Sequence, residues 1–110
     1  DSILSLRILA IDKHVSRHEN ISNLLSTQFE HADITIVEHL KNYHDELGIN
    51  NLVLVHVGNT VDYNIVFRKK LKCIVIYYTG QFDVIDVEGN VIFSPYDELE
   101  QAIEESGKIL

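Results

Sequence analysis

The sequence predicts an α/β domain built on an open, doubly wound parallel sheet. Four short apolar runs are rich in β-branched residues and do not alternate with polar ones, which is typical of strands buried on both faces. These runs are Arg7–Ile11, Ile34–Val37, Leu52–Val57 and Cys73–Tyr78. Segments with helical spacing separate them, and 110 residues suit one compact domain. Strand and helix therefore alternate, which places the functional groups at the carboxyl ends of the strands.

The first two helices are expected on either side of the second strand. Ser16 and Glu19 have the spacing of a capping box and precede an amphipathic stretch. A second helix is expected from Glu38 to Leu47, because apolar residues recur there with helical spacing and Gly48 stands where a helix C-terminus needs a glycine.

Two further helices are expected in the second half. One begins near Thr60 and ends before Lys72, and the last begins after Pro95 with Asp97 and Glu100 as a capping pair. Between them, near residues 83–93, two alternating runs surround Glu88-Gly89-Asn90, which favours a β-hairpin. A helix expected before the final strand is therefore shortened or replaced by this hairpin.

Composition narrows the class of function. Seventeen acidic and nine basic residues give a formal net charge of −8, which argues against nucleic acid and anionic membranes as partners. No apolar run approaches the roughly 20 residues of a membrane helix, and no signal peptide is recognisable, so we expect a cytoplasmic domain. The chain does not begin with methionine, which favours a single domain, residues 1–110, cut from a longer protein.

Three segments resemble the receiver domain of two-component response regulators. Ile8-Leu9-Ala10-Ile11-Asp12-Lys13 resembles the first strand and its terminal acid pair, and Asn51-Leu52-Val53-Leu54-Val55-His56 resembles the strand that ends in the phosphate-accepting aspartate. Ser94-Pro95-Tyr96-Asp97-Glu98-Leu99 resembles the Lys-Pro-Phe-Asp segment before the last helix. The resemblance implies a flavodoxin-like fold with five parallel strands in the order 2-1-3-4-5.

The resemblance also implies that the chemistry of the family is lost. Receiver domains hold magnesium with acids at the positions of Asp12, Lys13 and His56, and a lysine at the position of Ser94 contacts the phosphoryl group. Magnesium requires several hard oxygen ligands, so these replacements weaken the site. The family's hydroxyl residue corresponds to Thr79 or, without slippage, to Tyr78. A degenerate pseudo-receiver is therefore expected: no enzyme, no cofactor, and signalling by contact.

The expected partner is a protein or a neighbouring domain of the same chain, such as a kinase, sensor or output domain; a homodimer is a further alternative. The face corresponding to the receiver docking surface contains apolar residues that either form a partner surface or fold over the sheet. These are Phe82, Val84, Ile85, Val87 and Tyr96.

A rival interpretation is a metal- or small-ligand-binding switch at the strand-end crevice. Asp12, His14 and His56 offer one oxygen and two nitrogens, a set that suits zinc or another transition metal. Lys13 either pairs with Asp12 or points into solvent. His14 and His18 are four residues apart, as helical metal pairs are, but we expect them to face solvent. No local ligand motif supports the metal site, and no nucleophile elbow or phosphate loop supports an enzyme.

Overall fold

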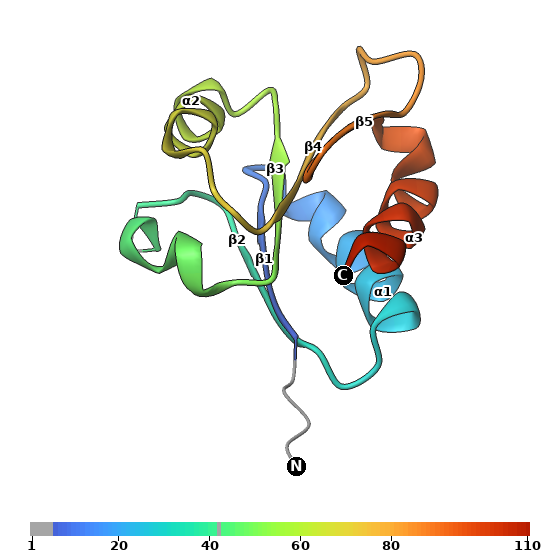
Figure 1. Ribbon diagram of the computed structural model, residues 1–110. Helices are drawn as coiled ribbons and strands as arrows, with labels where there is room; N and C mark the ends of the chain where they lie inside the picture. Colours follow the sequence, from blue (N-terminus) through green and yellow to red (C-terminus); the bar gives the residue numbers. More distant parts are fainter. Residues whose placement is uncertain (1–5, 42) are drawn as a thin grey trace.

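The computed structural model describes residues 6–41 and 43–110, which form a sheet in the order β2-β1-β3-β4-β6-β5 (Figure 1). Its strands are Arg7–Ile11 (β1), Asp33–Val37 (β2), Leu52–His56 (β3), Ile74–Thr79 (β4), Asp86–Glu88 (β5) and Val91–Pro95 (β6). All neighbours pair in parallel except β5, which is antiparallel to β6. The predicted α/β class and the order of the five parallel strands are confirmed, and β5 adds a sixth strand at the edge.

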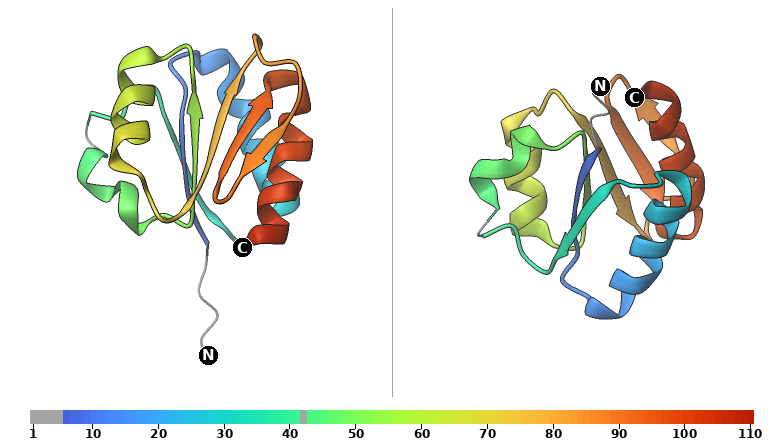
Figure 2. Two further views of the ribbon diagram at one scale, coloured as in Figure 1. Left: turned by 45° about the horizontal axis from the view of Figure 1, so that its top comes forward. Right: turned by 90° about the horizontal axis from the view of Figure 1, so that it is seen from below.

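Helices cover the two faces of the sheet unequally. Helices α1 (His18–Gln28) and α3 (Leu99–Ile109) lie together on one face, while α2 (Thr60–Lys69) and the 3₁₀ helix η2 (His44–Ile49) lie on the other (Figure 2). Alternate residues of the strands point to opposite faces and build two apolar cores. Side chains such as Ile76 face α3, whereas Val75 faces α2.

Both predicted capping pairs are absent. Ser16 lies inside a 3₁₀ turn, η1 (Val15–Arg17), so it does not occupy the N-cap position of α1, which Arg17 takes without a side-chain hydrogen bond. Another 3₁₀ turn, η3 (Tyr96–Glu98), displaces the start of α3 in the same way, and its N-cap is Glu98. Helices α1 and α3 form where expected, and a 3₁₀ turn directly precedes each of them.

The predicted helix from Glu38 to Leu47 is wrong. Only η2 is helical, and Gly48 lies inside it instead of following it. The backbone N–H of Leu40 donates to the Asp62 carboxylate at 3.1 Å, which ties this segment to α2. Part of the prediction, Asn42, lies outside the described residues.

The hairpin predicted near residues 83–93 is present and consists of β5 and β6. Gly89 has a φ of 64°, the left-handed conformation that this tight turn requires. Asn90 fixes the turn by donating from Nδ2 to the carbonyl oxygens of Leu71 (2.9 Å) and Cys73 (2.6 Å). Residues 80–90 are all described and contain no helix, so the helix that usually joins two parallel strands is missing between β4 and β6.

A helix that crosses a bilayer must be about 20 residues long and mostly apolar. Within residues 6–41 and 43–110, no helix is both long and apolar enough to span one.

Candidate functional site

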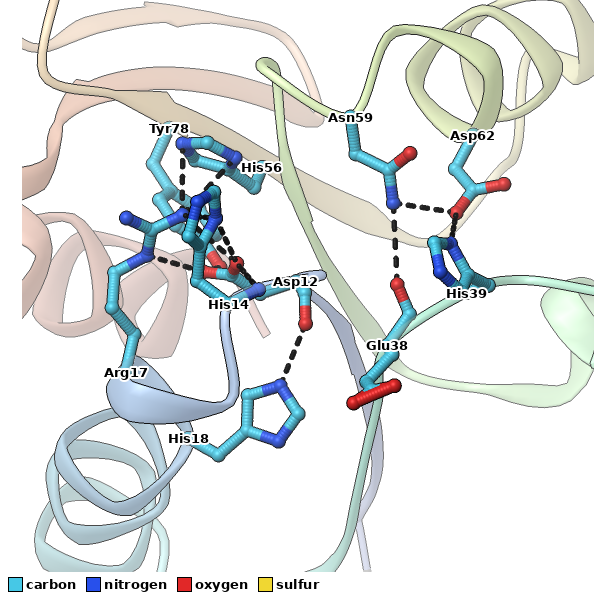
Figure 3. Close-up of polar contacts among 10 residues, drawn as sticks. All are labelled: Asp12, His14, Arg17, His18, Glu38, His39, His56, Asn59, Asp62 and Tyr78. Atoms are coloured by element: carbon cyan, nitrogen blue, oxygen red, sulfur yellow. Dashed lines mark hydrogen bonds and ion pairs between the residues drawn. The ribbon is translucent and has the colours of Figure 1, made fainter.

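Asp12 directly follows β1 and is completely buried, with four donors around its carboxylate (Figure 3). Oδ1 accepts from the backbone N–H of His14 at 2.8 Å and from Arg17 Nη2 at 2.9 Å. Oδ2 accepts from Arg17 Nε at 2.7 Å and from the Tyr78 hydroxyl at 2.8 Å. A carboxylate offers about four lone-pair positions, so every acceptor position of Asp12 is in use.

Arg17 is the residue that sequence reasoning missed. It stands in η1, directly before α1, and both of its contacts with Asp12 are charge-assisted hydrogen bonds in a two-pronged arrangement. Its guanidinium carbon lies 5.5 Å from the ring centre of Tyr96, where a cation–π contact adds to the ion pair. The predicted pairing of Lys13 with Asp12 does not occur; Lys13 is exposed, and the described residues provide it with no ion pair.

The charges explain why Asp12 stays ionised. Burial alone would raise its pKa, but the hydrogen bonds from Arg17, His14 and Tyr78 outweigh burial and hold the pKa of the Asp12 carboxyl below its ordinary value. In turn, burial and the neighbouring carboxylate raise the pKa of the Tyr78 hydroxyl, so Tyr78 remains a donor.

His56, the last residue of β3, faces the same cluster. Arg17 Nη2 lies 3.3 Å from the Nδ1 atom and 3.2 Å from the Nε2 atom of His56. The guanidinium is therefore almost equally close to both ring nitrogens. Burial and the positive charge of Arg17 lower the pKa of His56, against the opposing effect of Asp12. A Cβ atom on Gly58 would come within 2.6 Å of this ring, so Gly58 provides the room for it. His56 is therefore a neutral ring beside a fixed cation at neutral pH.

His14 and His18 do not form a pair on one helix face. Nδ1 of His14 lies 2.8 Å from Arg17 Nη2, on the side of the cluster open to solvent. Nε2 of His18 points elsewhere and donates to the backbone carbonyl of Asp12 at 2.6 Å (Figure 3). The two rings thus bind opposite sides of the Asp12 segment.

The hydroxyl in contact with Asp12 belongs to Tyr78 and not to Thr79. Tyr78 stands between His56 and Ser94 in the register of the parallel strands, and its side chain points toward Asp12. Thr79 is the next residue of β4, and its Oγ1 accepts from the backbone N–H of Gln81 at 3.4 Å. Ser94 is completely buried and donates to the carbonyl of Pro95 at 2.8 Å, so it does not reach the cluster.

The ligand set proposed for a transition metal is brought together. One ligand atom from each of Asp12, His14 and His56 lies within 4.8 Å of the other two. The Nη2 atom of Arg17 is within 3.3 Å of all three side chains and so supplies a positive charge at the point where they converge.

These residues do not fit the magnesium ion that the receiver resemblance implies. Asp12 has no acceptor position left, and the residues at the two other ligand positions, Lys13 and His56, contribute no oxygen. The positive charge beside Asp12 is the guanidinium of Arg17, a side chain of the protein itself.

A second polar cluster, which no sequence pattern indicated, lies at the start of α2. Asn59 and Asp62 are buried, and Asn59 Nδ2 donates to Asp62 Oδ2 at 2.6 Å and to the carbonyl of Glu38 at 3.3 Å. The exposed His39 ring lies 3.8 Å from the same carboxylate. Together with the Leu40 contact, this cluster ties the segment after β2 to α2.

The five residues predicted as a partner surface do not share one face. Phe82 and Val84 line a hollow beside α2. Ile85 and Tyr96 pack on the core of the opposite face, and Val87 is paired with Ile92, which belongs to that core.

Comparisons with known proteins agree with the architecture. No protein-family model matches the chain, and no curated protein matches it in sequence. Among solved structures, the chain is similar to a response regulator receiver domain protein from Bacillus halodurans C-125, with a TM-score of 0.71 and 16% identity over 94% of this chain and 97% of the other. At this identity the likeness establishes the fold alone: the chain has the fold of a receiver domain.

Proposed function

We propose that this chain is a non-catalytic signalling module, a pseudo-receiver that acts through protein contacts and is not phosphorylated on an aspartate. The single observation that carries the proposal is the saturation of Asp12 by Arg17, Tyr78 and His14. Aspartyl phosphorylation in receiver domains depends on a magnesium ion and an acceptor carboxylate, and here a guanidinium and an imidazole stand at those positions. The partner is a protein or a neighbouring kinase, sensor or output domain.

Incubation with acetyl phosphate and magnesium, followed by intact mass measurement, tests this function. A phosphorylatable receiver domain serves as the positive control. We expect the mass of this chain to remain unchanged while the control gains a phosphoryl group. A phosphoryl group on any aspartate or histidine of the chain would refute the proposal.

A second candidate function is a transition-metal switch at Asp12, His14 and His56. The convergence of their ligand atoms favours it, and zinc suits two imidazoles and a carboxylate. Metal binding requires Arg17 to swing away from Asp12, which its partial exposure to solvent permits. Calorimetric titration with zinc separates the two functions: one-to-one binding that is lost in His56→Ala supports the switch, and no binding supports the first proposal.

A further inference from the structure

A groove with an apolar floor runs along the sheet between α2 and the β5–β6 hairpin. Figure 2 shows α2 and the hairpin on either side of β3 and β4. Three adjoining hollows form it, since neighbouring hollows share Phe67, Val91 or Phe93. The largest, about 530 Å³, lies between Tyr63 of α2 and the loop residue Phe82. This groove occupies the place of the helix that is missing between β4 and β6.

Aromatic rings make up much of the floor. Tyr77 and Phe93 stack on neighbouring strands with ring centres 5.5 Å apart, and the rings of Tyr63 and Phe82 meet them edge-on at 5.0 and 5.9 Å. Phe67, at the edge, is 51% exposed. Exposed aromatic residues around a packed floor are typical of the centre of a protein interface.

Carboxylates stand along the hairpin side of the groove. Asp86 is paired with Phe93 and Glu88 with Val91 in the antiparallel register, so these two acids project on the same face as the floor. Asp83 lines the same side. Lys70, which lines the hollow near the start of β6, is the only basic residue that the three hollows contain among the described residues.

We propose that this groove binds an amphipathic helix of a partner protein whose apolar stripe is flanked by lysine or arginine. The inference rests on the proposed function and specifies its partner. The five residues of β6 span about 17 Å, which matches roughly three turns of helix. Apolar residues three and four positions apart would cover Phe93 and Phe67, and basic residues would face Asp83, Asp86 and Glu88. A second copy of this chain suits the groove less well, because it brings the same carboxylates and a net charge of −8.

The test uses two stapled helical peptides of roughly 15 residues, since unstapled helices of this length are marginal in water. Both carry the same leucine stripe, and the flanking residues are lysine in one and glutamate in the other. Each is titrated into the isotope-labelled chain and followed by amide NMR shifts. We expect the lysine peptide to shift residues of α2, β6 and the hairpin saturably, and the glutamate peptide to bind at least about tenfold more weakly.

Matched variants locate the site. Phe67→Ser, at an exposed position of the groove, should weaken binding at least about tenfold, whereas Val61→Ser, equally on α2 but outside the lining, should leave it unchanged. Asp86→Lys with Glu88→Lys should abolish the preference for the lysine peptide. The same charge change on α3, Glu100→Lys with Glu104→Lys, should preserve it.

Three results of the peptide titrations would overturn the inference: equal binding of both peptides, shifts confined to other faces, or no shift at millimolar peptide. Dimerisation of the chain through the same residues, seen by ultracentrifugation, would assign the groove to a second copy and would also overturn it. Failure of the proposed function has a different readout, a phosphoryl group in the mass spectrum, so the two failures are distinguishable.

Discussion

Arg17 and Asp12 form a two-pronged ion pair at the end of β1, with Nε–Oδ2 and Nη2–Oδ1 distances of 2.7 and 2.9 Å. The carboxylate is completely buried, and only 24% of the arginine side chain is exposed. The buried acid at the end of β1 is thus neutralised by the side chain of Arg17, five residues later in the chain. Removing either partner leaves an unbalanced charge, which makes the pair open to direct tests.

The substitution Arg17→Ala should destabilise the domain by about 3 kcal/mol, because it leaves a buried carboxylate without its cation. Urea unfolding monitored by circular dichroism measures this change. Lys13→Ala, at the adjacent exposed position, is the matched control and should alter stability by less than about 0.5 kcal/mol. Equal effects of the two substitutions would show that the ion pair does not stabilise the fold.

The same Arg17→Ala variant should gain zinc binding. Asp12, His14 and His56 already converge on the position that Nη2 occupies, so its removal leaves three ligands without a central cation. Calorimetry should detect one zinc per chain in the variant, and the additional substitution His56→Ala should abolish it. If the variant binds no more zinc than the unaltered chain, Arg17 is not what excludes a metal.

Tyr78→Phe should cost about 1.5 kcal/mol, because a hydrogen bond to the buried Asp12 carboxylate is lost. Tyr77→Phe is the control on the neighbouring position. Burial raises the pKa of Tyr77 to about 12, and its hydroxyl has no hydrogen-bond partner among the described residues. Thermal or urea unfolding should therefore separate the two variants clearly; a larger loss in Tyr77→Phe would contradict this assignment.

Acidification should destabilise the domain partly through His56. Its pKa in the folded state lies below the ordinary value of 6.5, so the folded state binds fewer protons than the unfolded state. The contribution is present above pH 6.5 and is lost as the pH falls through the lowered pKa. The free energy of unfolding can be measured from about pH 7.5 down to about pH 5, which covers the range in which histidine titrates. As the pH falls, it should decline more steeply for the unaltered chain than for His56→Asn. Parallel profiles would exclude His56 as the source.

Sequence patterns predicted the strands well because continuous apolar β-branched runs leave few alternatives in a domain of this size. They also placed Asp12 and His56 at neighbouring strand ends. Sequence patterns did not predict the role of Arg17, because the 3₁₀ turn η1, which places Arg17 beside Asp12, has no recognisable sequence motif. The segment expected as a helix from Glu38 is instead tied to α2 by Asp62, whose carboxylate accepts from the backbone N–H of Leu40, and no local pattern indicates a contact between residues 22 positions apart.

The proposal that Arg17 neutralises Asp12 in place of a magnesium ion is tested most directly by amide NMR spectra of the unaltered chain with magnesium and beryllofluoride, a mimic of the phosphoryl group. We expect no saturable shift of His14, His56 or Tyr78, because Asp12 has no free acceptor position and the end of β3 offers an imidazole and no carboxylate. Saturable shifts at these residues that require both reagents would contradict it and show that the receiver chemistry survives.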